Sequence, residues 1–418
     1  MALTIGCGIT LGVGVLALVA GATAEAQQPR RGETVTQRQR SDLDPLGVRA
    51  GGFLVYPELA VSEKYSDNTF ATPSGRKDDF ITDIEPKLRV QSDWNRHSLA
   101  LTAGADVGRF ASNSREDFED INVNLNGRAD VLRDRYLLGN VSWSKLHEDR
   151  GSPDDVNGAT PTEYTLLAPS IGAFNKWNRF SLRGDVALQR LDYDDVNASS
   201  GTATINNDDR DRTQYIVTVR AGYEIVPEYE GFVRGSWNTI DYREAVDDAG
   251  FDRDSDGYEV VAGTRIDFSG VTFGDVFAGY RRQSHDDALL NNVSGLSYGG
   301  AITWNASGLT TFKGSVTRTV EETTLSTSSG SFLTEVRASV DHELLRNLLV
   351  GGTFSYRLND YEGIAREDDE YRAGAYARYL MHRNLYLTAR YDFEKRESNA
   401  VGADYDKNIF LIRLETQL

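Results

Sequence analysis

The amino-acid sequence predicts an all-β fold, a transmembrane antiparallel up-and-down β-barrel of about 18 strands. Three observations lead to this prediction. Apolar and polar side chains alternate along many segments, and short turns alternate with long polar loops. In addition, no stretch after residue 26 holds the ~18 consecutive apolar residues that a membrane helix needs.

The alternation is clearest over residues 373–393, "AGAYARYLMHRNLYLTARYDF". Small or aromatic residues hold the odd positions from Ala373 to Tyr379, whereas Arg372 and Arg378 hold even positions. After a short His-Arg-Asn turn, the alternation resumes. Successive side chains of a strand point to opposite faces, so the segment is predicted to be a hairpin.

Turns and loops fix the expected number of strands. Nine long polar loops alternate with eight short turns, so that 17 connections join 18 strands. Alternation of long and short connections is typical of outer-membrane barrels. The short turns have the sequences "DWNRH" at 93, "LRDRY" at 132, "KWNRF" at 176, "VPEYE" at 226, "FSGVT" at 268, "ASGLT" at 306, "LRNLL" at 345 and "HRNLY" at 382.

Two other all-β folds fit the sequence less well. A β-propeller also repeats with a period near 40, but its blades hold four strands, whereas each repeat here holds two long ones. A soluble sheet could bury the face that carries Val217 and Val219, but the chain supplies no second layer to cover it. Closing the sheet pairs every backbone group, as lipid requires. We therefore expect Val219 to face lipid and Thr218 and Arg220 to face a wet lumen.

The chain is expected to have three parts. Residues 1–26 resemble a signal peptide, because a small, apolar stretch precedes Ala24-Glu25-Ala26, and they contain the single cysteine, Cys7. Residues 27–50 are polar and aperiodic, and we expect a flexible periplasmic arm. Residues 51–418 form the transmembrane barrel. The net charge of −18 argues against a nucleic-acid partner, which would need clustered cations.

Several motifs near the start of the barrel resemble those of a known family. They are Pro-Leu-Gly at Pro45, Gly-Phe-x-x-x-Pro around Phe53, Tyr-Ser-Asp-Asn from Tyr65, and Pro-x-Leu with "SDW" from Pro86. On these motifs the chain, from about residue 43 to its end, resembles the putative β-barrel porin 2 family. The resemblance implies an exported barrel of the bacterial outer membrane and a link to exopolysaccharide export.

The end of the chain points to the same compartment. In "KNIFLIRLETQL" alternate apolar residues run to the last position, which resembles the carboxy-terminal insertion signal of outer-membrane proteins. We expect as partners the barrel assembly machinery, outer-membrane lipid, lipopolysaccharide and polysaccharide-export proteins. The amino terminus is expected in the periplasm.

Charged residues of the inward parity are the candidate site. They form either a ladder of ion pairs that stiffens the wall or a mixed-charge constriction that orients polar solutes. We expect Arg357, Arg372 and Arg378 to lack inward carboxylates and to form a positive strip, and the loop at 194–211 to constrict the lumen. The lumen-lining candidates are Arg220, Arg265, Arg337, Arg357, Arg372, Arg378, Arg390, Glu224 and Asp392.

No catalytic, cofactor or metal site is expected. Asp252, Asp254 and Asp256 resemble the start of a calcium loop, but Gly263 stands where the final glutamate is required. The sequence therefore favours a porin-like channel for hydrophilic solutes. A non-conducting structural or surface-interaction barrel is the second interpretation, and a lipid-modifying enzyme is the third.

Overall fold

The computed structural model describes residues 32–201, 203–268, 270–323, 325 and 328–418. The signal peptide expected over residues 1–26 lies outside these residues, as does the start of the expected arm. Within the described residues, the two short 3₁₀ turns are neither long nor apolar enough to cross a membrane.

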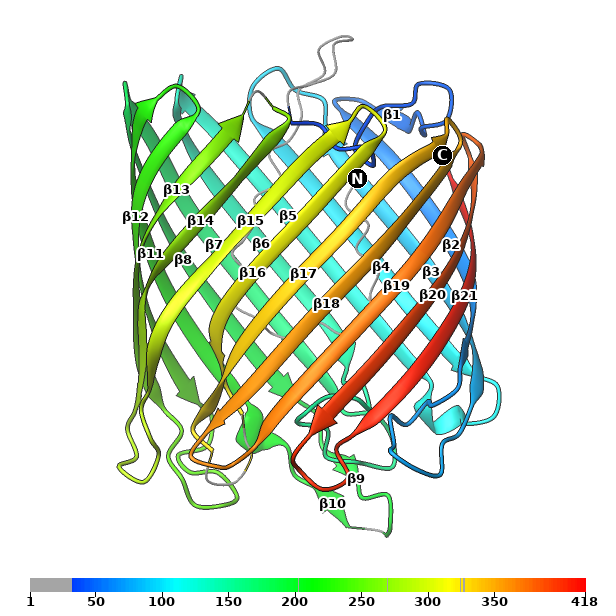
Figure 1. Ribbon diagram of the computed structural model, residues 1–418, viewed down its shortest axis with the longest axis vertical. Helices are drawn as coiled ribbons and strands as arrows, with labels where there is room; N and C mark the ends of the chain where they lie inside the picture. Colours follow the sequence, from blue (N-terminus) through cyan, green and yellow to red (C-terminus); the bar gives the residue numbers. More distant parts are fainter. Residues whose placement is uncertain (1–31, 202, 269, 324, 326–327) are drawn as a thin grey trace.

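Eighteen long strands form one antiparallel sheet that closes on itself (Figure 1), as the sequence predicted. Each strand pairs with the next along the chain, and the last, β21, pairs with the first, β2. The barrel strands are β2 Phe53–Ser66, β3 Asp79–Ser92, β4 Ser98–Phe110, β5 Phe118–Leu132, β6 Arg135–His147, β7 Glu163–Trp177, β8 Phe180–Tyr193, β11 Arg212–Val226, β12 Tyr229–Tyr242, β13 Ser255–Phe268, β14 Thr272–His285, β15 Val293–Ser307, β16 Thr310–Glu321, β17 Gly330–Leu345, β18 Leu348–Glu362, β19 Glu367–His382, β20 Leu385–Ser398 and β21 Tyr405–Gln417.

Short elements lie outside this cylinder. Strand β1 (Val48–Ala50) pairs with the start of β2. Strands β9 (Val196–Asn197) and β10 (Thr204–Ile205) form a small hairpin in a long loop, and the 3₁₀ turns are η1 (Ser114–Glu116) and η2 (Asp208–Arg210).

All eight predicted short turns lie at one end of the barrel and all nine long loops at the other (Figure 1). Several of the turns use residues with positive φ, among them Asn178 and Asp134, and this conformation suits the local hydrogen bonding of Asn and Asp. We call these ends the short-turn end and the long-loop end.

The hairpin predicted over residues 373–393 is formed by β19 and β20. Ala373 lies opposite Phe393, and Tyr379 lies opposite Leu387. Tyr379 and Leu387 are exposed on the outer surface, whereas Arg378 is buried inside. The period-two pattern therefore assigned the two faces of this hairpin correctly.

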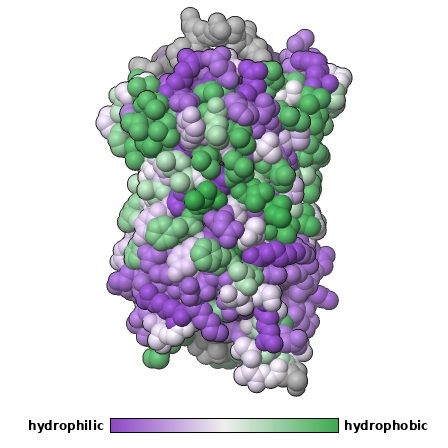
Figure 2. All heavy atoms as spheres, turned by 90° about the vertical axis from the view of Figure 1, so that its right-hand side faces the viewer, coloured by the Kyte–Doolittle hydropathy of each residue, from purple (hydrophilic) through white to green (hydrophobic). Residues whose placement is uncertain are grey.

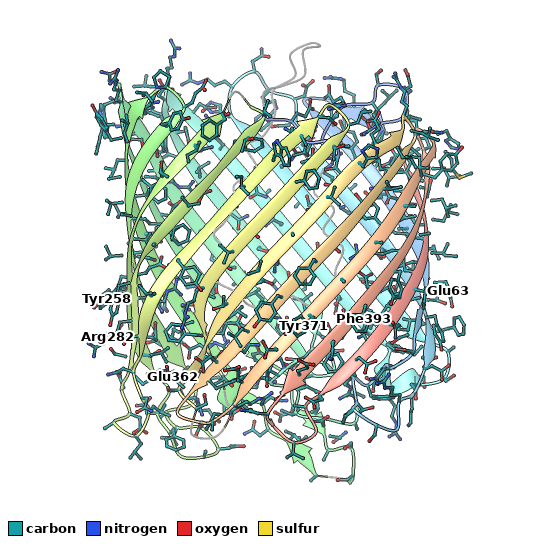
Figure 3. All side chains as sticks on the ribbon, in the orientation of Figure 1. Glu63, Tyr258, Arg282, Glu362, Tyr371 and Phe393 are labelled. Atoms are coloured by element: carbon teal, nitrogen blue, oxygen red, sulfur yellow. The ribbon has the colours of Figure 1, made fainter. Side chains whose placement is uncertain are left out.

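The outer surface carries a band of apolar side chains. Figure 2 shows hydrophobic residues gathered over the upper and middle parts of one face, with a mostly hydrophilic part toward the long loops. Exposed Val219, Val233 and Val260 belong to this band on neighbouring strands. Toward the long-loop end, Tyr258 and Glu63 lie at similar heights on opposite sides of the barrel, and Arg282 lies closer to the long loops (Figure 3). An apolar band with aromatic residues at its edge is the surface that a bilayer requires.

Candidate functional site: the charged inner wall and its obstructions

The inner wall from β16 to β21 is covered by coupled ion pairs. Glu370 of β19 lies at their centre and contacts three guanidinium groups. Arg357 of β18 is 3.3 Å away, Arg396 of β20 is 3.5 Å away and Arg372 is 3.9 Å away. Glu370 is buried, so these cations offset the desolvation of its charge.

Further pairs extend this cluster along the wall. Arg357 also lies 3.8 Å from Glu321 of β16 and 3.9 Å from Glu335 of β17. On the other side, Glu394 of β20 lies between Arg372 and Lys407, at 4.0 Å and 3.8 Å. Acidic and basic groups thus alternate across six neighbouring strands.

A second chain of pairs runs closer to the short-turn end. Arg378 donates to Glu415 of β21 over 2.7 Å, and Arg413 lies between Glu415 and Glu85 of β3. The ring of Tyr386 lies 4.8 Å below the Arg378 guanidinium. Arg378 and Glu415 are both buried, so each depends on the other for compensation of its charge.

The positive strip expected from the sequence is therefore wrong. Arg357, Arg372 and Arg378 each have carboxylate partners. Two facts hid these partners. Strand β19 begins at Glu367, and its register places Glu370 opposite Arg357 of β18, which the separate strands do not reveal. In addition, Arg378 reaches across β20 to a carboxylate two strands away.

The other candidates occupy more local pairs. Arg220 pairs with Glu230, Arg390 pairs with Asp392, and Lys176 donates to Glu224 over 2.6 Å. Arg265 has no ion pair among the residues that the structure describes. Arg337 lies 2.8 Å from Glu335, but its side chain remains 64% exposed. Among the candidates in ion pairs, Arg337 is the cation most available to a passing solute.

A further charged cluster surrounds Glu259, whose inward parity is visible in the sequence, whereas its partners are not. Glu259 of β13 accepts hydrogen bonds from Arg234 of β12, Arg281 of β14 and Ser297 of β15, at 3.1, 2.7 and 2.6 Å. The two arginines come from strands whose apolar positions are sparse. The available signal was parity, because Arg234 follows the outward-facing Val233 and Arg281 follows the outward-facing Tyr280.

The loop at 148–162, between β6 and β7, crosses the lumen at the long-loop end. Its Asp154 accepts a 2.8 Å hydrogen bond from Thr323, which follows β16 on a distant part of the wall. Near the start of β21, a Cβ atom added at Gly151 would lie 2.8 Å from the Tyr405 hydroxyl. The loop therefore contacts the wall at places separated by several strands in both directions.

Buried salt bridges hold this loop in place. Arg150 makes two hydrogen bonds to Glu116, at 2.7 and 2.8 Å. Arg210 makes two more to Glu148, at 3.0 and 2.8 Å. Burial raises the pKa of Asp155 to about 6, although Arg150, 3.6 Å away, lowers it.

The loop at 194–211 has a supporting role. We expected it to constrict the lumen because it is the longest, but its β9–β10 hairpin projects from the long-loop end (Figure 1). It supplies Arg210, which holds Glu148 of the crossing loop. Length alone was the wrong criterion, because charged anchors decide which loop folds inward.

The amino-terminal arm occupies the opposite mouth. The expected flexibility over 27–50 does not fit the described part, since Val35 is 1% exposed and Arg40 is 6% exposed. The Val35 N–H donates to Thr311 of β16 over 3.0 Å, and Arg40 pairs with Glu343 of β17 over 2.8 Å. The Tyr386 hydroxyl donates to the Leu43 carbonyl over 2.5 Å. Burial of polar partners on three strands explains why this polar segment is held inside the short-turn mouth.

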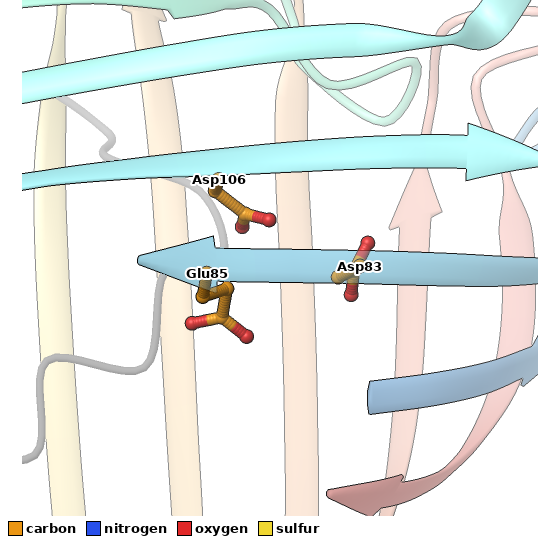
Figure 4. Close-up of side chains that lie close together, drawn as sticks. All are labelled: Asp83, Glu85 and Asp106. Atoms are coloured by element: carbon orange, nitrogen blue, oxygen red, sulfur yellow. The ribbon is translucent and has the colours of Figure 1, made fainter. Parts of the chain in front are cut away.

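Three carboxylates gather on the inner wall near β3 and β4. Asp83, Glu85 and Asp106 each bring an oxygen within 4.8 Å of the others (Figure 4). Lys64 pairs with Asp83 and Arg413 pairs with Glu85, so protein cations already balance much of the charge.

Two of the aspartates that resemble the start of a calcium loop bond backbone groups. Asp252 accepts a hydrogen bond from the Asp254 N–H, and Asp254 accepts one from the N–H of Tyr242 at the end of β12.

A closed barrel with an apolar outer band and a charged inner wall defines a porin-like protein of the outer membrane. Residues 41–418 match the model of one family, described as Putative beta-barrel porin 2, and the chain belongs to that family. The resemblance stated from the motifs is thereby confirmed. No curated protein matches the chain.

Solved structures similar to this chain include three from Pseudomonas aeruginosa. OpdK, crystallised with vanillate, is 11% identical with a TM-score of 0.44, over 87% of this chain and 99% of its own. OccK3 (OpdO) is 13% identical with a TM-score of 0.45, over 87% of this chain and 96% of its own. The siderophore receptor PirA is 8% identical with a TM-score of 0.45, over 87% of this chain and 80% of its own.

Proposed function

We propose that the protein is a passive outer-membrane channel that conducts small hydrophilic solutes through the barrel. The supporting observation is the inner wall, where arginine and lysine side chains alternate with carboxylates around Glu370 and Glu415. Such a wall offers hydrogen bonds to polar solutes of either charge. It also disfavours apolar ones, which cannot replace the lost hydration of the charges.

The two obstructions determine what can pass. The crossing loop narrows the long-loop end, and the arm occupies part of the short-turn mouth. Solutes must therefore pass beside both, which favours small molecules over polymers. We propose that the short-turn end, with the arm, faces the periplasm and that the long loops face outward.

A non-conducting structural barrel is the second candidate function, and the same obstructions favour it. Planar-bilayer recordings of purified protein separate the two. Stepwise conductance in potassium chloride is expected for the channel. If neither the full chain nor a variant lacking residues 32–44 conducts, the structural barrel is favoured.

Export of exopolysaccharide remains an expectation from the family resemblance. Proteoliposome swelling with a size series of sugars tests it directly. Swelling with monosaccharides alone fits the proposed small-solute channel. Swelling with long dextrins as well would favour polysaccharide passage instead.

A further inference from the structure

The wall between β15 and β16 is only partly hydrogen-bonded. Their pairing runs from Ser307 opposite Thr310 to Gly299 opposite Thr317, and then it ends. Residues 293–298 of β15 still pair with β14, and residues 318–321 of β16 still pair with β17. Two strand edges therefore face each other without a ladder, and we call this region the seam.

The seam begins at the edge of the apolar band. Leu296 of β15 lies opposite Tyr280 of β14, whose ring is 6.4 Å from that of Tyr258. All three side chains are exposed on the outer surface. Tyrosines at this position mark the boundary between hydrocarbon and head groups. The seam therefore opens at the level of the leaflet nearer the long loops.

An apolar cluster, not backbone hydrogen bonding, closes the seam. Val293 of β15, Val320 of β16 and Phe332 of β17 are buried against one another. The Phe332 ring lies 3.1 Å from the place of a Cβ atom on Gly295. Val293 and Gly295 have the inward parity of β15, because the alternate Leu296 is exposed outside. The ends of β16 and β17 therefore overlap β15 from inside the barrel.

A small cavity of about 80 Å³ lies on the inner side of the seam. Its lining combines neutral amides from four strands, Gln189, Gln214, Asn238 and Gln283, with charges of both signs from Arg212, Glu259, Arg281, Glu321 and Glu322. Amides donate and accept hydrogen bonds, as hydroxyl groups do, so the two are complementary. Val320 of the apolar cluster lines the same cavity, which makes the cavity and the seam continuous.

Hydrogen bonds tie both edges of the seam to this cavity. Ser297 of β15 donates to Glu259 over 2.6 Å, and Arg281 donates to Thr319 of β16 over 2.7 Å. Glu259 and Arg281 both line the cavity and bond each other over 2.7 Å. A ligand that replaces these bonds would therefore release both edges together.

We propose that the cavity and the seam form a binding site and lateral exit for an amphiphile with a neutral, sugar-like head and an alkyl chain. The head would bond the amides, and the chain would replace Phe332 between Val293 and Val320 and extend into the outer leaflet. Exchange of one apolar contact for another costs little, whereas an open strand edge in lipid would cost several kcal/mol per unpaired group. This site goes beyond the proposed channel, since it needs no conduction through the lumen.

Dodecyl maltoside with a photoreactive diazirine on its alkyl chain is the test probe. In proteoliposomes, labelling mapped by mass spectrometry is expected within residues 293–298 and 318–321. Joining Val293→Cys to Val320→Cys with a short bis-maleimide, in a Cys7→Ser background, should reduce this labelling by about tenfold. Joining Ala301→Cys to Ser315→Cys, opposite each other in the paired part, should leave it unchanged.

Two further comparisons keep the test decisive. Phe332→Ala should increase labelling at the seam, and excess unlabelled dodecyl maltoside should compete far better than maltose. Labelling spread evenly around the apolar band, or unaffected by the Val293–Val320 linkage, would overturn the proposal. Single-channel conductance recorded on the same linked protein reports on the channel separately, and we expect it to persist.

Discussion

Arg40 of the amino-terminal arm and Glu343 of β17 form an ion pair 2.8 Å long inside the short-turn mouth of the barrel. Arg40 also donates to the Val35 carbonyl over 3.0 Å, so one guanidinium group holds the arm both to itself and to the wall. This arrangement makes the arm an internal obstruction whose removal can be measured.

Weakening that contact should open the mouth. Arg40→Ala leaves Glu343 without its cation and Val35 without a donor, so we expect the arm to detach and single-channel conductance to increase. Arg346→Ala is the matched control, because its pair with Asp42 is exposed and worth at most about 1 kcal/mol. Equal conductance in wild type and Arg40→Ala would show that the arm does not limit the current.

Charge reversal on the inner wall should separate buried from exposed arginines. Arg378→Glu places two carboxylates together where Glu415 is buried. We expect failed assembly, since breaking a buried pair costs roughly 3–5 kcal/mol. Arg337→Glu should fold, because that side chain is 64% exposed, and its reversal potential in a salt gradient should move toward cation selectivity. Heat-modifiable migration on gels reports assembly. An unchanged reversal potential for Arg337→Glu would place Arg337 outside the ion path.

The two faces of β11 should respond oppositely to a cation. Val219 is exposed on the apolar band, so Val219→Arg should impair assembly by roughly 2–4 kcal/mol. Thr218→Arg should be tolerated, because Thr218 faces inward, bonds Ser236 and lies opposite Asp185. Urea unfolding of both variants in lipid vesicles measures the difference. Equal losses at the two positions would contradict the assignment of faces.

Surface tagging should report the orientation of the barrel. Epitope tags inserted at Asn206 or Ala249, in long loops, should bind antibody on intact cells. Tags at Asn178 or Asn347, in short turns, should bind only after the outer membrane is permeabilised. The reverse pattern would place the arm at the cell exterior.

The crossing loop should be sensitive to pH through Asp155. Its carboxyl pKa is raised from 3.8 to about 6, first by burial, so the folded loop binds a proton more tightly than the unfolded one. The tighter proton binding stabilises the folded loop by at most roughly 3 kcal/mol. This stabilisation is fully present below about pH 4 and is lost as pH rises through 6. Hydrogen exchange over residues 148–162 should therefore be slower at pH 4.5 than at pH 7.5.

Asp155→Asn is the control for this effect, because it removes the titrating group and keeps its size. The exchange rate of its crossing loop, corrected for intrinsic chemistry, should be nearly independent of pH. A wild-type loop that exchanges faster at low pH would mean that Asp155 does not control the pH response of the loop.

The sequence predicted the strands because their alternation is local. Val219 faces lipid and Thr218 faces water whatever their neighbours are, since parity alone decides. Ion pairs depend on the stagger between strands, which no single strand encodes. Arg378 reaches Glu415 across β20, and Arg357 lies opposite Glu370 because of the register between β18 and β19.

The obstructions were hidden for a related reason. Polar loops and a polar arm look alike in sequence whether they project into water or fold into a wet lumen, because both surroundings are polar. Anchors such as Arg150 with Glu116, or Arg40 with Glu343, come from distant parts of the chain. Their pairing requires the closed barrel.

Closure between β21 and β2 also constrains the order of assembly. The two strands share a ladder from Glu58 opposite Gln417 to Ser66 opposite Ile409, so the first barrel strand has no partner on that side until the last has been synthesised. Joining chain ends so far apart is entropically costly, and such long-range pairing forms slowly. The arm precedes β2 and binds β16, β17 and β20, which also arrive late. An export-competent precursor must therefore keep its leading segment unpaired throughout its passage across the periplasm.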